Sequence, residues 1–308
     1  MNVKRPILIA GPTAGGKSGL ALRLAEALGG IVINADSMQV YRELRILTAR
    51  PSEADEARVP HALYGFVAGN EAYSAGRYAA DAARALKAAC EKGLRPIIVG
   101  GTGLYFKALT EGLSPMPEIP DEIRARWRSA AGKTEPGALH ALLAQRDPEM
   151  AARLAPGDTQ RIVRALEVLD ASGVSLLDWQ QRPRAPVVDM AGTVRLVVAP
   201  ERDVLDARID ARFEQMMATG ALEEVRQLVE LGLDPQLPLM SALGVRPLMA
   251  HLTGALSREA AVAAAQTETR QYVKRQLTWA RGNMISWKWI SEKELQSNQG
   301  DFVSFIDY

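Results

Sequence analysis

One stretch near the N-terminus has the residue types and spacing of a phosphate site: Gly11-Pro12-Thr13-Ala14-Gly15-Gly16-Lys17-Ser18. It fits the pattern G-x-x-x-x-G-K-[ST] in full. Its glycines let successive backbone N–H groups turn inward around phosphate oxygens, and the following helix presents its positive end. We expect the lysine to reach the phosphates and the serine hydroxyl to ligate Mg²⁺. The residues predicted to bind the phosphates are Gly11, Thr13, Ala14, Gly15, Gly16, Lys17 and Ser18.

An acid that nucleotide-hydrolysing proteins use is missing from its usual place. In such proteins a second apolar strand ends in an Asp that helps to hold Mg²⁺. The candidate strand here, "PIIVGGTG", ends in Gly100-Gly101-Thr102 instead. Asp36, in "INADS", is the acid found at a strand end. It could ligate metal through water, cap a following helix or act as a general base. The missing metal-binding acid favours a base, in a reaction where diphosphate leaves and a nucleophile loses a proton.

A basic helix is predicted near the C-terminus, in "TRQYVKRQLTWARGN". Arg270, Lys274, Thr278 and Arg281 recur at the spacing of one helix face, with Arg275 beside them. From position 268 to 288 there are five basic residues and one acid. Such a stripe is typical of a surface that binds a polyanion, although a solvated basic face would show the same pattern.

A weaker basic signal lies in "DTQRIVRALEV", which places Gln160, Arg161 and Arg164 on one short helical stretch. Together with the C-terminal stripe, it favours a nucleic acid bound between two domains.

The elements that position these residues alternate between strand and helix. Residues 6–10 (PILIA), 31–33 and "RPIIVGG" predict buried parallel strands, each followed by a polar turn, and a further strand is expected near "ALYGFV". A helix is expected from about Lys17 to Leu28, and another after Ser74 as N-cap. The alternation predicts an α/β fold with a doubly wound parallel sheet, whose ligands bind at the carboxyl ends of the strands. "GPTAGGKS", "ADS" and "GGTG" all lie at such ends.

The chain changes character at "LSPMPEIPDE" and again at "QRPRAPVVDM", both rich in proline. Between these breaks the sequence has helical periodicity only, and afterwards "TVRLVVAP" predicts a strand followed by helices to about Arg281. We therefore expect an α/β catalytic core of residues 1–119 and 192–308, interrupted by a helical insertion domain of residues 120–191.

Composition restricts the class of protein. No run of about 18 apolar residues occurs and no signal-peptide core is present, so we expect a cytoplasmic protein with no membrane contact. Cys90 is the only cysteine, which excludes an internal disulfide and predicts a buried thiol. The three isolated histidines make a zinc site improbable. A formal net charge of +1 means that nucleic-acid binding must come from local patches.

With these residues in hand, the sequence resembles the tRNA dimethylallyltransferase (tRNA isopentenyltransferase) family. The stretches that carry the resemblance run in family order over about 280 residues: "GPTAGGKS", "INADSMQVYR", "LTARP", "YSAGRY", "IIVGGTGLYFKAL", "GLSPMP", "DTQRIVRALEV", "RIDARFEQMM" and "RQYVKRQLTWARGN". The resemblance implies a P-loop NTPase-like core and transfer of a dimethylallyl group from dimethylallyl diphosphate to the exocyclic amine of the adenine just 3′ of a tRNA anticodon. It also implies Mg²⁺, and we expect a monomer.

The resemblance gives roles to particular positions. Asp36 matches the family's general base, and Thr102 lies in the glycine turn that the family places against the reacting groups. Arg212, in "RIDARF", matches an arginine near the diphosphate, and with Lys17 completes the expected catalytic set. The residues expected to contact tRNA are Asp36, Ser37, Met38, Gln39, Arg124, Gln160, Arg161, Arg164, Lys274, Arg275 and Arg281.

Two departures from the family pattern leave the tRNA preference open. Val245, in "ALGVRPL", stands where the family usually has Tyr, so a contact with the anticodon loop is expected to be apolar. "HALYGFV" lacks the acid that many members carry after the histidine.

Three other functions compete with this one. An adenylate isopentenyltransferase acting on free AMP or ADP would need neither the helical insertion nor the basic stripe. A small-molecule kinase should carry the missing strand-end Asp, and a nucleotide-gated RNA-binding protein would have no use for Asp36.

Overall fold

The computed structural model describes residues 5–135 and 137–297, and the chain divides into two compact units. The core unit consists of residues 1–110 and 186–308, and the insertion unit of residues 111–185. The proline-rich breaks in the sequence had predicted boundaries at 119/120 and 191/192. In the structure the divisions fall at 110/111, before the first proline-rich segment, and at 185/186, within the second one.

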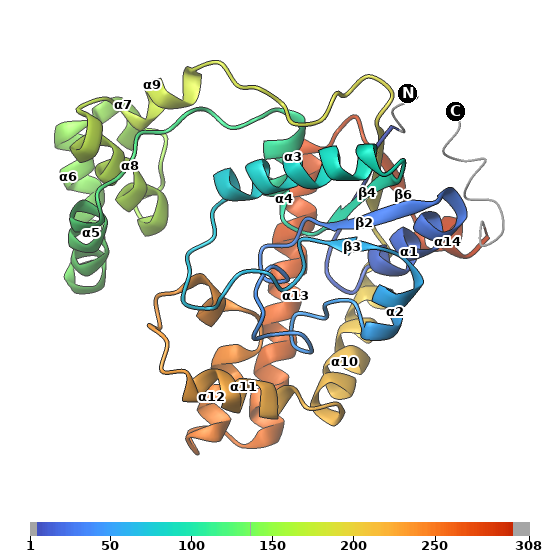
Figure 1. The fold of residues 1–308 in the computed structure, drawn as a ribbon. Helices are drawn as coiled ribbons and strands as arrows, with labels where there is room; N and C mark the ends of the chain where they lie inside the picture. Colours follow the sequence, from blue (N-terminus) through green and yellow to red (C-terminus); the bar gives the residue numbers. More distant parts are fainter. Residues whose placement is uncertain (1–4, 136, 298–308) are drawn as a thin grey trace. The chain divides into compact units, whose positions relative to one another are not determined.

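The core unit is built on a six-stranded sheet in which every pair of neighbouring strands is parallel (Figure 1). The strands follow the order β3-β2-β4-β1-β5-β6. Their bounds are β1 Ile7–Ala10, β2 Gly30–Asn34, β3 His61–Ala62, β4 Arg95–Gly100, β5 Val194–Val198 and β6 Lys288–Ile290. This is the doubly wound α/β fold that the alternating pattern predicted.

Both faces of the sheet are buried, which explains the unbroken apolar runs in the central strands. Side chains of a strand point alternately to the two faces. Ile7 and Ile9 pack with Leu20 and Leu24 of the first helix, whereas Leu8 packs in the cluster on the opposite face.

Helices of the core unit cover both faces of the sheet, and most of the chain after β5 is helical. The predicted N-cap of α3 is present, because the Ser74 side chain accepts a hydrogen bond from Arg77 N. The helices are α1 Lys17–Leu28, α2 Glu53–Arg58, α3 Ala75–Glu91, α4 Gly103–Thr110, α10 Arg202–Ala218, α11 Ala221–Glu230, the 3₁₀ helix Pro238–Ser241, α12 Val245–Leu252, α13 Arg258–Asn283 and α14 Glu292–Ser297. Cys90 is partly exposed, so the expectation of a buried thiol is wrong.

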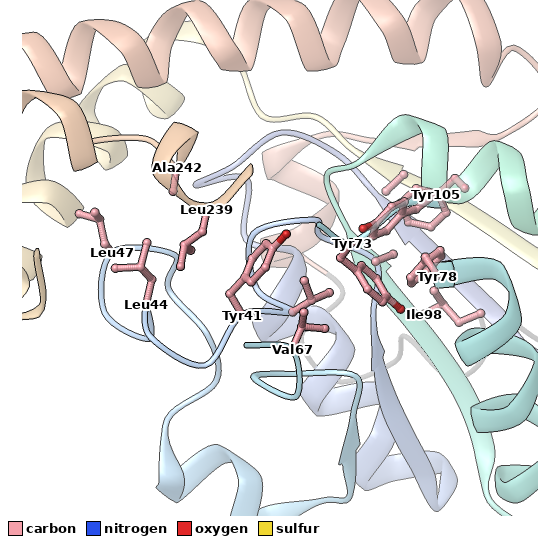
Figure 2. Close-up of a cluster of buried hydrophobic side chains, with 14 of the residues drawn as sticks. Tyr41, Leu44, Leu47, Val67, Tyr73, Tyr78, Ile98, Tyr105, Leu239 and Ala242 are labelled. Carbon is pink, nitrogen blue, oxygen red and sulfur yellow. The ribbon is translucent and has the colours of Figure 1, made fainter. Parts of the chain in front are cut away.

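The expected strand at "ALYGFV" is much shorter than predicted. Only His61–Ala62 pair with β2, and Val67 forms an isolated bridge with Tyr41. Leu63 and Gly65 adopt positive φ, which turns the backbone away from the sheet. The segment instead lies against a buried cluster around Tyr41, Leu44, Tyr73 and Leu239 (Figure 2).

The insertion unit is helical in the part that the structure describes, as its periodicity predicted. Its own core is formed by apolar side chains that include Trp127, Leu143, Ile162 and Leu166. The helices are α5 Asp121–Lys133, α6 Ala138–Arg146, α7 Pro148–Ala151, α8 Thr159–Ser172 and α9 Leu176–Gln181. Within the described residues of both units, we find no helix with the length and apolar character that crossing a membrane requires.

Candidate active site

Three polar turns meet at the carboxyl edge of the sheet because their strands are neighbours. β4 lies between β2 and β1, and the turns follow these strands directly. Ala10 pairs with Gly100 and Asn34 with Val99, so the three strands end at nearly the same level. The phosphate loop (11–18), the Asp36 turn (35–39) and the glycine turn (100–103) therefore share one site, as the sequence predicted.

The phosphate loop leaves the N-terminus of α1 without a competing acid. Gly16 is the N-cap of α1 with φ of 88°, no side chain caps the helix, and no acidic residue lies in its first turn. The first N–H groups of a helix have no intrahelical acceptor, so an uncapped first turn binds anions well. Gly11 is required for space, since a Cβ there would lie 2.2 Å from the carbonyl oxygen of Val198.

Lys17 is folded back onto its own loop, where Nζ donates a hydrogen bond to the carbonyl oxygen of Pro12. The pKa of Lys17 is lowered to about 8, mainly by burial; the charge of Asp36 opposes this shift and the charge of Arg212 adds to it. The ammonium group is therefore poorly solvated, and an anion in the loop would stabilise its charged form.

Asp36 is held in a tight turn by a residue that the sequence analysis did not single out. The fully buried Asn34 accepts a hydrogen bond from Asp36 N at 2.8 Å and donates to the carbonyl oxygens of Asp36 and Leu63 at 2.9 and 3.0 Å. Oδ1 of Asp36 accepts from Met38 N at 2.9 Å, while Oδ2 has no hydrogen-bond partner among the described residues. No helix begins here, so the alternative of a helix cap is wrong.

Thr102 joins the glycine turn to the Asp36 turn. Its Oγ1 accepts a hydrogen bond from Ser37 N at 2.9 Å and lies 3.3 Å from Ser37 Oγ, to which it can donate. Thr102 N donates to the carbonyl oxygen of Ala35 at 3.2 Å. The Thr102 hydroxyl also lowers the pKa of Tyr272 on α13, although burial raises that pKa by more. Tyr272 was not predicted as a site residue.

Asp36 lies among cations and neutral hydroxyls. Burial lowers the pKa of the partly buried Arg212, while the charge of Asp36 opposes that shift. Burial, together with the charge of Asp36, raises the pKa of Tyr64, Tyr105 and Tyr272 well above the usual value. These tyrosines stay protonated near neutral pH, so Asp36 is the anionic group at the centre of the site.

A small cavity of about 40 Å³ adjoins the phosphate loop within the core unit. Thr13 and Arg212 contribute polar groups to its wall, and most of the remaining wall is apolar. Thr48 and Thr269 are also polar, and the apolar lining residues are Ala14, Leu47, Ile209, Phe213, Met216 and Leu243.

Helix α13 presents two different faces, and only one of them was anticipated. Lys274, Arg275 and Arg281 are exposed, as the basic stripe required, and Arg275 lies over the Tyr272 ring at 5.6 Å. Arg270 departs from that expectation, because its guanidinium pairs with Asp206 and Asp210 of α10. Positions 272, 276 and 279 form the second face.

This second face contacts the site directly. Gln276 hydrogen-bonds both the phosphate loop and the glycine turn, and a Cβ on Gly103 would lie 2.3 Å from the Trp279 ring. The spacing i, i+4, i+7 of Tyr272, Gln276 and Trp279 could have predicted this face, but the basic residues beside it gave the stronger pattern.

The other predicted tRNA-binding residues differ in exposure and in ion pairing. Gln160 and Arg161 are exposed on the first turn of α8, and Arg161 pairs with Asp158. Arg164 pairs with the buried Glu167, and Arg124 pairs with Asp121 at the start of α5. These four residues belong to the insertion unit, whereas the other predicted site residues belong to the core unit.

Two further positions are less available than the sequence suggested. The Gln39 side chain donates to the carbonyl oxygens of Thr48 and Ala49 at 2.9 and 3.1 Å. Val245 is fully buried at the start of α12, so the expected apolar contact surface is not present there.

Comparisons with known proteins agree with one another. The family model described as IPP transferase matches residues 39–283. The chain is 54% identical over 306 residues to a tRNA dimethylallyltransferase of Parvibaculum lavamentivorans, covering 99% of this chain and 96% of the relative. It is 56% identical over 292 residues to a protein of the same name from Methylobacterium nodulans, covering 94% of this chain and 96% of that protein.

Solved structures give the same result for the fold. A tRNA isopentenylpyrophosphate transferase of Bacillus halodurans matches with a TM-score of 0.69 and 29% identity, covering 99% of this chain and 97% of its own. A eukaryotic dimethylallyltransferase, described as acting on tRNA, matches with a TM-score of 0.78 and 27% identity, covering 98% of this chain and 78% of its own. Since the family model spans most of the chain and the relatives share more than half of its residues over nearly its whole length, the chain belongs to the IPP transferase family.

Proposed function

We propose that this protein transfers a dimethylallyl group from dimethylallyl diphosphate to the N6 amine of the adenine 3′-adjacent to a tRNA anticodon, releasing diphosphate. The observation that carries the proposal is the grouping of Lys17, Arg212 and Asp36 around a phosphate loop whose neighbouring strand ends in Gly-Gly-Thr and not in an acid. Two cations beside the loop suit a departing diphosphate, and one carboxylate suits a proton acceptor.

The donor would bind with its diphosphate in the loop and its alkyl chain in the adjoining cavity. The first N–H groups of α1, Lys17 and Arg212 would stabilise the negative charge that develops on the leaving diphosphate. On binding, the Lys17 ammonium would exchange its contact with the Pro12 carbonyl for phosphate oxygens. The cavity is small, and Leu47, Phe213 and Leu243 give it an apolar side against which a short alkyl chain could pack.

Asp36 would accept the proton that the adenine amine loses as the new C–N bond forms and the allylic C–O bond breaks. Its Oδ2 has no partner among the described residues, and its turn is fixed by Asn34. Thr102, held by Ser37 and Ala35, would orient the attacking amine or the diphosphate.

The residues present fit a magnesium ion bound mainly by the diphosphate. Within the described residues no group of three or more His, Cys, Asp or Glu side chains could hold a metal ion. Mg²⁺ commonly keeps several waters and takes one or two protein ligands plus substrate phosphates. Ser18 would hold it, with Asp36 nearby, and when bound it would neutralise charge on the leaving group.

The tRNA would be bound by exposed cations of α13 and of the insertion unit, chiefly Lys274, Arg275, Arg281 and Arg161. The target adenine must leave the anticodon-loop stack, which costs a few kcal/mol and requires compensating backbone contacts. Free AMP would require neither the insertion unit nor this basic face. Both features therefore favour tRNA over AMP as the acceptor, and an adenylate isopentenyltransferase is the alternative that the experiment must test.

The test is to incubate the purified protein with dimethylallyl diphosphate, Mg²⁺ and equal concentrations of an unmodified anticodon stem-loop and AMP. The products are then digested and analysed by mass spectrometry. The proposal predicts that N6-isopentenyladenosine appears in the stem-loop, next to the anticodon. Modified AMP with an unmodified stem-loop would overturn it in favour of the adenylate enzyme.

A further inference from the structure

One side-chain amide of α13 links two turns of the site. Thr13 N donates a hydrogen bond to Oε1 of Gln276 at 2.9 Å, and Nε2 of Gln276 donates to the carbonyl oxygen of Gly101 at 2.9 Å. Gln276 is far from both turns in sequence. The phosphate loop after β1 and the glycine turn after β4 are thus connected through a single primary amide, which uses both its donor and its acceptor.

The helix approaches these turns so closely that they need glycine. A Cβ on Gly101 would lie 2.2 Å from Nε2 of Gln276, and one on Gly103 would lie 2.3 Å from the Trp279 ring. Real Cβ atoms do not reach such distances, so a side chain at position 101 would push the Gln276 amide away, and one at position 103 would push the Trp279 ring away. The absence of a side chain at Gly101 therefore leaves the space that the partly buried Gln276 amide occupies.

The contact also decides which loop amides remain for the substrate. The Thr13 N–H is already bound by Gln276, and the Gly15 N–H donates to the carbonyl oxygen of Pro12 at 3.2 Å. The uncapped first turn of α1 is thereby left to face an anion. Thr13 was expected to bind phosphate, but its backbone N–H is engaged in fixing the loop.

We infer that Gln276 is a positioning residue for the transfer reaction: it fixes the phosphate loop against the turn that carries Thr102. The inference rests on the proposed function, since the loop must hold the diphosphate while Thr102 and Asp36 face the acceptor. Displacement of reacting groups by about 1 Å costs on the order of a hundredfold in rate. A neutral amide also avoids negative charge beside a bound diphosphate, which a glutamate of the same shape would introduce.

The test compares Gln276→Ala, Gln276→Glu and the control Gln271→Ala, which removes an exposed glutamine from the same helix. Each variant is measured for kcat and KM with dimethylallyl diphosphate, for the Kd of inorganic diphosphate, for the Kd of tRNA and for Tm. Gln276→Ala should raise the Kd of diphosphate and lower kcat by about 10- to 100-fold. Gln276→Glu should bind diphosphate more weakly still, because its carboxylate repels both the Gly101 carbonyl and the ligand.

In both Gln276 variants the Kd of tRNA and Tm should stay close to those of the control. A lowered Tm with unchanged kcat per folded molecule would mean that Gln276 only supports the fold, and this would overturn the inference. Unchanged kcat and unchanged diphosphate binding would overturn it as well. If the wild-type protein transferred no dimethylallyl group, the proposed function would fail, and the Kd of inorganic diphosphate would still decide whether Gln276 orders the loop.

Discussion

Oγ1 of Thr102 lies 2.9 Å from the backbone nitrogen of Ser37, whose N–H it accepts. The two residues are far apart in sequence and end adjacent strands, so this bond joins the glycine turn to the turn of the proposed base. Because Asp36 precedes Ser37, the position of its carboxylate depends on Thr102 as well as on Asn34. The candidate base is therefore fixed from two sides before any substrate arrives, which reduces the reorganisation needed during the reaction.

Replacing the proposed base should affect chemistry and spare binding. Asp36→Asn keeps the acceptor for Met38 N but removes the basic oxygen, so the single-turnover rate should fall by on the order of a hundredfold or more. The Kd of tRNA should change little. Asp203→Asn, at an exposed position of α10, is the matched control. A rate equal to that of the wild type would remove Asp36 from this role.

The lowered pKa of Lys17 predicts a pH dependence of donor binding. With a pKa of about 8 in place of 10.5, Lys17 in the free protein loses its proton between about pH 7 and 9, where an ordinary lysine stays charged. Diphosphate binding must then return a proton to Lys17. Deprotonation of Lys17 should therefore weaken the affinity for diphosphate by up to about tenfold per pH unit above 8.

Lys17→Arg separates this effect from the ionisation of diphosphate itself, because arginine keeps its charge throughout this range. Titration of inorganic diphosphate from pH 7 to 9.5 should show a ratio of variant Kd to wild-type Kd that falls as pH rises. A constant ratio would show that Lys17 does not titrate there.

The exposed cations of α13 should bind tRNA through its phosphates. Lys274→Ala with Arg275→Ala should weaken tRNA binding and reduce the slope of log K against log salt by about one to two, since each lost phosphate contact contributes roughly 0.7–0.9. The Kd of dimethylallyl diphosphate should not change. Arg84→Ala with Lys87→Ala removes the same charge from exposed positions of α3. An equal loss of slope in both double variants would mean that net charge, and not this face, determines binding.

The cavity beside the phosphate loop should limit the length of the donor chain. Leu243→Ala enlarges the apolar wall, so the ratio of kcat/KM for geranyl diphosphate to kcat/KM for dimethylallyl diphosphate should rise about tenfold or more. Leu231→Ala, at a side chain 54% exposed, is the control for the same substitution elsewhere. If the ratio does not move, the alkyl chain lies outside this cavity.

Asp170 should be a main source of stability in the insertion unit. Burial raises its pKa, but hydrogen bonds from Arg146 and Trp127 outweigh burial and hold the pKa below the usual value. A carboxyl whose pKa is lowered by folding stabilises the protein fully at pH values above its pKa in the unfolded chain. This contribution is lost as pH falls through its pKa in the folded protein. Asp170→Asn should therefore destabilise the unit by about 1–3 kcal/mol at pH 7, with a smaller difference near pH 3, by chemical denaturation. Equal stabilities at pH 7 would contradict this assignment.

Features that depend on local sequence could be predicted, and those that depend on packing could not. The limits of α1 and the N-cap at Ser74 follow from glycine, serine and apolar spacing, and the structure has them where they were expected. β6 was missed because three residues carry almost no periodicity and acquire strand geometry only by pairing with β5. α2 was also missed, although Ser52 and Asp55 form a capping box that marks its start.

The same division holds for the site. The phosphate loop, Asp36 and Thr102 could be found because each follows a recognisable strand, and parallel strands bring their carboxyl ends together. Gln276 and Tyr272 could not, because their contacts depend on how α13 packs against these turns. Arg270 had the spacing of a nucleic-acid contact, but α10 supplies the acids that pair with it.

The most direct test of the proposed function is to determine whether the phosphate loop binds dimethylallyl diphosphate or ATP as the donor substrate. The protein would be incubated with Mg²⁺, unmodified tRNA and either dimethylallyl diphosphate labelled in its alkyl group or ATP labelled at the γ-phosphate. The proposed function predicts label in tRNA from the isoprenoid donor without any nucleotide added, and no transfer or hydrolysis of the γ-phosphate. Consumption of ATP with no label from the isoprenoid donor would contradict it, because the loop would then serve a nucleotide and Asp36 would need another role.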